Sequence, residues 1–485
     1  MENSSKYAGY AWSLIGSIAA IRLIIAFFLP VAPQEAYYWN YALHPALSYF
    51  DHPPMTAYLI LLFTRIFGNN FFGVHFASIF ISFVLSLVLY YSVRIIFDDR
   101  TAFWTVVVGS STFIFALGGL VITPDAPLLL FWMLTMFSLY FAVKQSDLKL
   151  WLLTGIFLGC AFVSKYTAAF AALGLLLYLI SSRERLSNLL KPGPYISAIA
   201  AFIVFLPVVV WNYSNNWASF GFQSGRRASE ISHLRPDAFF GFLGSQIGVL
   251  AIFLFPLFIW ALIKAAKYLK QDERVALYFW FAAPTAIFFT LVAWLVYVKM
   301  NWLAPAYLSV LPPAVYFVLN SSKKFIKIYS KLALTFSIVL TLAVHILVFI
   351  PEFGFGKGDT LHGWSELADK VEQVRTDMEA SGPYFICGYE YKPASELRFY
   401  LRGQPETVSD NIVGGDGLQY DFWCNPDTLV GKNCIFVYDT RNSYHGDLSN
   451  YFNQVDEPEI LTVQRGGKKI TDFYIYKCYD YRGIR

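Results

Sequence analysis

The chain has 485 residues, of which 56% are hydrophobic and 14% are charged, and its mean hydropathy is +0.48. A soluble domain could not bury this much apolar surface, and repeated apolar runs of about 20 residues indicate a polytopic α-helical membrane protein. The net charge of +4 is small, and basic residues fall near the predicted helix ends, which excludes a nucleic-acid footprint and indicates a topology signal.

Apolar runs predict eleven membrane spans. The first run, 10–29, is too long for the hydrophobic part of a cleaved signal peptide, and no small-residue cleavage site follows it, so we interpret it as a retained span. The segment 55–67 is apolar but short, which favours an interfacial helix. The other predicted spans are 72–97, 102–121, 126–143, 151–164, 166–181, 195–212, 240–264, 276–297, 303–320 and 332–350.

The distribution of lysine and arginine predicts the orientation. If the N-terminus is cytoplasmic, the inside segments hold sixteen of these residues and the outside segments hold six. This bias follows the positive-inside rule. Eleven spans then place the first polar loop and the C-terminal tail outside the cytoplasm, so we expect a multi-pass protein of the bacterial inner membrane with a periplasmic tail.

The sequence predicts two domains, a transmembrane domain at 1–350 and a small α/β domain at 351–485. The tail carries most of the acidic residues and several turn signals. Its predicted elements are helices at 364–379 and 394–401 and strands at 384–389, 434–438, 460–464 and 473–476.

Four of the five cysteines lie in the tail, without CxxC or zinc-finger spacing. If the tail is extracytoplasmic, one or two disulfides can form. Equally, Cys387, Cys434 and Cys478 lie in strand-like runs and can be small core hydrophobes.

The first polar loop carries the strongest candidates for chemistry, because polar groups beside lipid are costly and usually functional. Glu35 and Asp51 can serve as a general base and an orienting carboxylate. Alternatively, Glu35 charges the start of a helix at 36–41, and Asp51 accepts backbone hydrogens in an Asp-His-Pro-Pro turn. His44 and His52 can be metal ligands, but their spacing matches no established site, and hydrogen-bonding histidines are favoured.

Later polar residues fall on the same predicted face. Asp125 can orient a sugar hydroxyl or simply cap a helix. Lys165, inside an apolar stretch, needs a partner such as a phosphate, or its ammonium reaches the interface. Arg226 and Arg227 can clamp an anion or form a solvated loop face. For Arg22, within the first span, a structural role is favoured.

Several catalytic and nucleotide-binding motifs are absent: the chain has no GxxxxGK[ST], GxGxxG, HExxH or GxSxG, and no Asp-x-Asp that would hold a metal against a nucleotide diphosphate. A site at the outer face therefore fits a lipid-carried donor better than a nucleotide sugar. No cofactor is predicted, and a divalent metal is left open.

The assembled motifs resemble those of the GT-C membrane glycosyltransferases, in the bacterial branch related to protein O-mannosyltransferases and the lipid A aminoarabinose transferase. Gln34-Glu35-Ala36-Tyr37-Tyr38-Trp39 is similar to that branch's Asp-Glu-Ala-Tyr-Tyr-Trp, and Tyr49-Phe50-Asp51-His52-Pro53-Pro54 is similar to its Tyr-Phe-Asp-His-Pro-Pro. Weaker likenesses occur at Thr123–Pro127, Ser164–Thr167, Asn301–Tyr307 and Ala394–Leu401.

The resemblance implies transfer of a sugar from a polyprenyl phosphate to an acceptor at the outer face, usually with inversion. The acidic pair of the family maps to Gln34 and Glu35, so the first acid is missing here. A hydroxyl acceptor needs a base, whereas an anionic acceptor such as a lipid A phosphate needs cations to hold it. The predicted catalytic residues are Glu35, Asp125 and Asp51, and those predicted to bind donor or acceptor are Gln34, Tyr37, Tyr38, His52, Lys165, Arg226, Arg227 and Asn301.

We therefore expect an envelope acceptor such as lipid A, lipopolysaccharide or another surface glycan. A protein acceptor is the first alternative. A transporter or flippase of lipid-linked sugars is the second, although no inverted repeat is visible. A scaffold protein that binds partners through its tail is the third.

Overall fold

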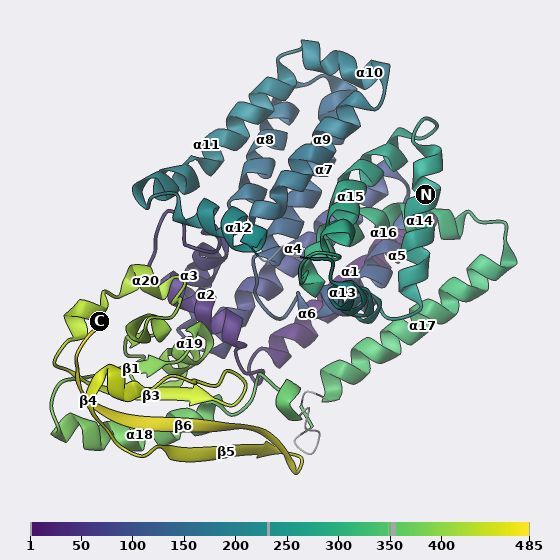
Figure 1. The fold of residues 1–485 in the computed structure, drawn as a ribbon. Helices are drawn as coiled ribbons and strands as arrows, with labels where there is room; N and C mark the ends of the chain where they lie inside the picture. The colour runs from purple at the N-terminus through teal and green to yellow at the C-terminus, as the bar shows by residue number, and fades with distance from the viewer. Residues whose placement is uncertain (1, 230–232, 348, 351–355, 485) are drawn as a thin grey trace. The chain divides into compact units, whose positions relative to one another are not determined.

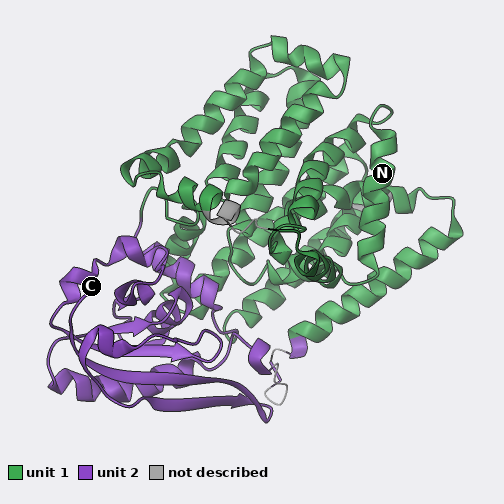
Figure 2. Ribbon diagram, viewed as in Figure 1, with its two compact units in different colours: residues 1–28, 46–345 green, residues 29–45, 346–485 purple. Residues whose placement is uncertain are grey.

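The computed structural model describes residues 2–229, 233–347, 349–350 and 356–484. The chain divides into two compact units, coloured separately in Figure 2: unit 1 comprises Met1–Phe28 and Ala46–His345, and unit 2 comprises Leu29–Pro45 and Ile346–Arg485. The sequence predicts a single domain boundary at residue 350, whereas in the structure residues 29–45 also pack with the tail.

Unit 1 is helical throughout its described part (Figure 1). Its α-helices are α1 (Glu2–Ile25), α3 (Met55–Phe67), α4 (Phe71–Ile96), α5 (Asp99–Ser111), α6 (Phe113–Leu117), α7 (Asp125–Gln145), α8 (Leu148–Phe162), α9 (Ala169–Ile180), α10 (Arg183–Leu186), α11 (Gly193–Ser214), α12 (Ala218–Ser229), α13 (Pro236–Val249), α14 (Leu254–Tyr268), α15 (Glu273–Val292), α16 (Ala304–Leu319) and α17 (Lys324–Leu347). Short 3-10 helices are η1 (Tyr166–Ala168), η2 (Ser187–Leu190) and η3 (Met300–Leu303).

A polytopic membrane fold is confirmed, but the count of eleven spans is not. Among the described residues, seven helices are long and apolar enough to cross a membrane, or nine if each of two bent pairs is one span. The predicted span 240–264 is such a pair, because α13 and α14 meet at 101° around Ala251, whose φ is +58°. The predicted span 102–121 is also interrupted, since Thr112 is extended between α5 and α6.

Among the candidate spans of the described residues, α7 and the segment of η3 and α16 are the most buried. Trp132 of α7 is fully buried, and its indole N–H donates to Ser309 Oγ of α16 at 3.0 Å. Asp125 is the first residue of α7, and Asn301 lies in η3, which leads directly into α16. The N-terminal ends of two buried helices therefore carry two of the predicted site residues.

Unit 2 is a small α/β domain, as predicted. Its elements are α2 (Pro33–Leu43), η4 (Gly356–Gly358), α18 (Trp364–Ala380), β1 (Tyr384–Gly388), α19 (Tyr391–Tyr400), β2 (Thr407–Val408), η5 (Asp410–Val413), α20 (Tyr420–Trp423), η6 (Pro426–Leu429), β3 (Asn433–Asp439), η7 (Leu448–Asn450), β4 (Phe452–Val455), β5 (Glu459–Arg465) and β6 (Lys468–Tyr481). The sheet order is β2-β1-β3-β6-β4, with β5 also paired to β6.

The sheet is mixed and has a core on each face. Strands β1, β2 and β3 are parallel, whereas β6 runs antiparallel to β3, β4 and β5. Side chains alternate between the faces, so Ile386 joins a core with Trp364, while the neighbouring Cys387 joins the opposite core. The two short strands β2 and β4 were not predicted.

The three strand cysteines are core residues. Cys387, Cys434 and Cys478 are fully buried, and none of the five cysteines, all of which the structure describes, forms a disulfide. The interpretation as small core hydrophobes is therefore confirmed. Burial raises the pKa of the Cys387 and Cys434 thiols well above its usual value, so these thiols are poor nucleophiles.

Candidate functional site

Asp125 and Lys165 form a buried ion pair in unit 1. The Lys165 ammonium lies 2.7 Å from Asp125 Oδ1, and the two side chains are 9% and 10% exposed. Lys165 has an extended backbone between α8 and η1, where the apolar run is broken. An ion pair this buried requires close geometry, because both charges have lost their hydration.

The amide of Asn301 completes this arrangement. Its Nδ2 donates to Asp125 Oδ2 at 2.6 Å, so each carboxylate oxygen of Asp125 has a donor. Three residues predicted separately from the sequence thus form one cluster, which we call the Asp125 cluster. Lys165 retains N–H donors beyond the one used by Asp125, and an ammonium of this kind is suited to bind a phosphate.

The second half of the first polar loop is tied to neighbouring elements of unit 1. The backbone N–H of Met55 donates to Val163 O at 3.0 Å, two residues before Lys165. Gln223 of α12 donates to Asp51 O at 2.9 Å. The turn that carries Asp51 and His52 is thereby anchored on one side near Lys165 and on the other side on α12.

A hydrogen bond in the first turn of α12 also holds this helix in place. The Tyr166 hydroxyl is 2.6 Å from Ser219 Oγ, and Ser219 is fully buried. The same helix includes Arg226 and Arg227, but their side chains lie outside the described residues. Ser219 was not predicted as a site residue, since a single serine in an aromatic loop gives no sequence signal.

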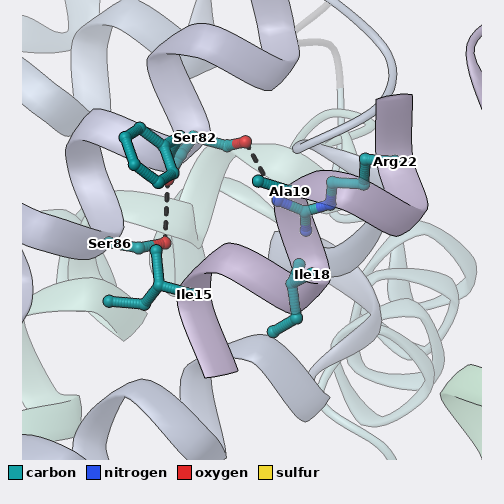
Figure 3. A pocket seen from close by; sticks show the side chains of 7 residues that line it. Ile15, Ile18, Ala19, Arg22, Ser82 and Ser86 are labelled. Atoms are coloured by element: carbon teal, nitrogen blue, oxygen red, sulfur yellow. Dashed lines mark hydrogen bonds between the residues drawn. The ribbon is translucent and has the colours of Figure 1, made fainter. Parts of the chain in front are cut away.

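Arg22 has the structural role that the sequence favours. Its guanidinium is buried and donates to Ser82 Oγ at 2.9 Å and to the carbonyls of Phe115 and Ala116 at 3.2 Å each. These carbonyls are in the last turn of α6, where they lack helical partners. A small pocket beside this contact (Figure 3) contains none of the predicted catalytic residues; its lining is Ile15, Ile18, Ala19, Arg22, Ser82, Phe83 and Ser86.

The first half of the polar loop forms α2 of unit 2. Glu35 is fully buried, and its Oε2 accepts the N–H of Ala32 at 3.0 Å, so it caps the start of this helix. Tyr37 is 1% exposed and Tyr38 is 6% exposed. The Tyr37 hydroxyl accepts the N–H of Gln419 at 3.1 Å. Gln34, beside Glu35, is partly exposed.

The histidines of the loop do not form a metal site in the described structure. His44 lies 3.2 Å from Glu406 and stacks on Trp423 with ring centroids 4.6 Å apart. The N–H of Tyr49 donates to His52 O at 3.2 Å within the turn. Within the described residues, no group of three or more His, Cys, Asp or Glu side chains is arranged to hold a metal ion.

Comparison with known proteins relates the chain to membrane glycosyltransferases. The family model of dolichyl-phosphate-mannose-protein mannosyltransferase matches residues 51–211, which include Asp51, His52, Asp125 and Lys165. The chain is 24% identical over 273 residues to the lipid A galacturonosyltransferase RgtD of Rhizobium johnstonii, covering 54% of each chain. It is 31% identical over 218 residues to an undecaprenyl phosphate-alpha-4-amino-4-deoxy-L-arabinose arabinosyl transferase of Pseudomonas savastanoi pv. phaseolicola, covering 40% of each chain.

The fold is also that of a solved structure. ArnT from Cupriavidus metallidurans, bound to undecaprenyl phosphate, superposes with a TM-score of 0.66 at 12% identity, over 96% of this chain and 97% of that one. The chain therefore has an ArnT-like fold, and its sequence similarity to glycosyltransferases agrees with the resemblance seen in its motifs. The matched regions span about half the length of the two curated relatives, or less.

Proposed function

We propose that the protein is an integral-membrane glycosyltransferase that moves a sugar from a polyprenyl phosphate to an envelope acceptor, with lipid A as the first candidate. The buried Asp125–Lys165–Asn301 cluster carries the proposal. Three comparisons support it. The mannosyltransferase family model matches residues 51–211, and a relative of similar sequence is a lipid A galacturonosyltransferase. A protein of the same fold was solved with bound undecaprenyl phosphate.

Lys165 is the proposed ligand of the donor phosphate. In the transfer, a bond forms between sugar C1 and an oxygen of the acceptor while the bond between C1 and the phosphate oxygen breaks, and the polyprenyl phosphate leaves with the bonding electrons of the broken bond. A cation beside that oxygen stabilises the charge that develops on it, and stabilises it strongly because the site is buried. Asp125, with both oxygens engaged, orients Lys165 and Asn301 for this task.

The acceptor decides whether a base is needed. A hydroxyl acceptor must give its proton to a carboxylate, for which Asp51 and Glu35 are the proposed candidates. Asp125 is a third candidate, provided that it first releases the hydrogen bond from Lys165 or Asn301. A phosphate acceptor is already anionic and needs cations, a role we assign to Arg226 and Arg227. Since Gln34 replaces the first acid of the family motif, we favour the anionic acceptor. Tyr37, Tyr38 and His52 remain proposed binding residues.

A transfer assay tests the function. Purified protein is incubated with a radiolabelled polyprenyl-phosphate sugar and a membrane lipid extract, and the wild type should label a lipid A fraction. Lys165→Met should lower transfer by about 10²-fold or more. Lys144→Met is the matched control, because Lys144 forms an ion pair of the same 2.7 Å length with Glu273 but both side chains are 40–44% exposed.

Two results would contradict the proposal. Full transfer by Lys165→Met would remove Lys165 from the site, and movement of labelled donor across the bilayer without transfer would favour the transporter. Separately, full turnover by Glu35→Gln would exclude Glu35 as the base, and faster transfer to a hydroxyl acceptor by Gln34→Asp would support the role given to Gln34.

The orientation belongs to the same proposal. We place the N-terminus in the cytoplasm and unit 2 in the periplasm, since lysine and arginine concentrate in the segments that this orientation puts inside. Alkaline phosphatase, whose disulfides form only outside the cytoplasm, should be active when fused after residue 484, whereas a stably expressed but inactive fusion would reverse the orientation.

A further inference from the structure

Within unit 2, α2 packs against α19. The indole of Trp39 meets the ring of Phe399 edge to face, with centroids 5.0 Å apart. Asn40 Nδ2 lies 3.5 Å from the Tyr420 hydroxyl, which in turn lies 2.9 Å from Ser395 Oγ of α19. The helix that carries Glu35 is therefore held by α19 and by the chain that follows it.

This contact encloses two carboxyl groups. Glu35 of α2 and Glu396 of α19 are both fully buried. Glu35 has the Ala32 N–H as a donor to its Oε2, at the positive end of α2. Glu396, by contrast, has no hydrogen-bond partner at either oxygen in the described structure.

The surroundings of Glu396 oppose a second negative charge. Burial raises the pKa of Glu396 well above its usual value, and the charge of Glu35 raises it further. Arg441 lowers it, but Arg441 is engaged with Asp439, at 2.7 Å. A buried carboxylate without donors costs several kcal/mol, so the neutral acid is the stable form.

Other charged groups that face this region add to the negative potential. Glu366 of α18 acts with Glu35 and Glu396 to raise the pKa of Tyr400, on the same helix as Glu396, after burial as the main cause. Arg398, also on α19, pairs with Glu406. On Glu396 itself, Glu35 is the acidic group that acts and Arg441 is the basic one.

We propose that Glu396 is a positioning residue for Glu35: as a neutral acid it leaves a single negative charge, that of Glu35, in the α2–α19 contact. Ionisation of Glu396 adds a second buried charge beside the first, and the repulsion loosens α2 from α19. The inference rests on the role proposed for Glu35 in transfer, since the position of α2 sets the position of Glu35.

Infrared spectroscopy tests the neutral acid without any activity measurement. Full-length protein in detergent at about pH 7 should show the carbonyl band of a protonated carboxyl group, which Glu396→Gln removes. Glu457→Gln is the control, because Glu457 is an exposed glutamate of the same unit, and it should keep the band. Loss of the same band in the control, or no change in Glu396→Gln, would overturn the proposal.

Hydrogen exchange tests the loosening of α2. After correction for intrinsic rates, amides of residues 33–43 in the wild type should exchange about tenfold faster at about pH 9 than at about pH 6. Glu396→Gln should abolish this increase. Glu35→Gln, which keeps Glu396, should move both the increase in exchange and the loss of the infrared band to lower pH. Equal exchange at both pH values in the wild type would contradict the proposal.

The sign of the Glu35→Gln effect follows from the charges. Removing the Glu35 charge removes a cause that raises the pKa of Glu396, so ionisation and loosening should both occur at lower pH, which is the result we expect. A shift to higher pH would overturn the coupling. Transfer activity is measured last: Glu396→Gln should retain turnover to higher pH than the wild type, and these structural readouts remain interpretable even if the protein transfers no sugar.

Discussion

The ammonium of Lys165 and the carboxylate of Asp125 lie 2.7 Å apart although 40 residues separate them in the chain, and both side chains are about nine-tenths buried. Asp125→Asn should therefore destabilise the protein by about 3–5 kcal/mol, because Lys165 is left as a buried charge without its counterion. The double change Asp125→Asn with Lys165→Met should recover part of this loss but no transfer. Thermal unfolding in detergent and the transfer assay measure the two effects.

The exposed pair of Lys144 and Glu273 is the control for this prediction. Breaking it by Lys144→Met should cost no more than about 1 kcal/mol, since exposed ion pairs contribute little. If the two single changes, Asp125→Asn and Lys144→Met, destabilise equally, the Asp125 cluster does not have the low-dielectric environment proposed for catalysis.

Gly119→Ala should disrupt the Arg22 contact. A Cβ at Gly119 would overlap the guanidinium of Arg22, whereas a Cβ at Gly16 on α1 meets nothing within 4 Å. We expect Gly119→Ala to cost about 1–3 kcal/mol, as overpacking does, and Gly16→Ala to be neutral or slightly stabilising. Unfolding midpoints of the two variants in the same detergent check this, and an unchanged midpoint for Gly119→Ala would contradict the observed placement of Arg22.

Tyr37→Phe should loosen the segment around Gln419. The hydroxyl of Tyr37 accepts the Gln419 N–H, and without it a buried donor loses its partner at a cost of about 1–3 kcal/mol. Hydrogen exchange of the peptide that contains residue 419 should rise accordingly. Tyr474→Phe is a suitable control, because Tyr474 stacks on Tyr438 with centroids 4.8 Å apart and this contact needs no hydroxyl.

Asp421 should make unit 2 less stable as the pH rises. Burial raises the pKa of Asp421 to about 6, and the charges of Asp410 and Asp416 contribute while a backbone N–H of Gly417 opposes. The folded state thus holds a proton that the unfolded state releases, so this stability is present below about pH 4 and is lost as the pH rises to about 6. Asp421→Asn should stabilise relative to the wild type above about pH 6 and match it below about pH 4.

Urea unfolding at several pH values measures this difference. Asp427→Asn, at another exposed position of the same region, controls for the loss of one carboxylate. A constant difference between Asp421→Asn and the wild type across the pH range would contradict the prediction.

The sequence identified the members of the Asp125 cluster but not their contact. Asp125, Lys165 and Asn301 each interrupt an apolar stretch, and such an interruption is visible in one dimension. Asn301 is 176 residues from Asp125, and which helix ends meet is decided by packing around residues such as Trp132 and Ser309. Hydropathy also marks apolar runs without marking breaks within them, so the interruptions at Thr112 and Ala251 were missed.

For Glu396, the sequence predicted the helix but not the burial of the side chain. Its helix was predicted at 394–401, and the helix forms at Tyr391–Tyr400, but a glutamate in a polar tail is ordinarily solvated. Its helix packs against α2 as well as against α18 and the sheet, and no local pattern connects α2 to the tail. The strands β1, β3, β5 and β6 were predicted because their apolar runs are long enough, whereas β2 has two residues and gives too short a signal.

Unit 2 is built from two segments that are far apart in the chain, and this has a consequence for biosynthesis. Asn40 and Tyr37 contact partners 380 and 382 residues further along the chain, so α2 leaves the ribosome long before the sheet and helices that bury Trp39 exist. Contacts this distant form slowly, and until then the aromatic face of α2 needs temporary cover. A chain truncated after His345 would keep that face uncovered permanently, so we expect such a nascent product to be a substrate for quality-control proteolysis rather than a minimal working enzyme.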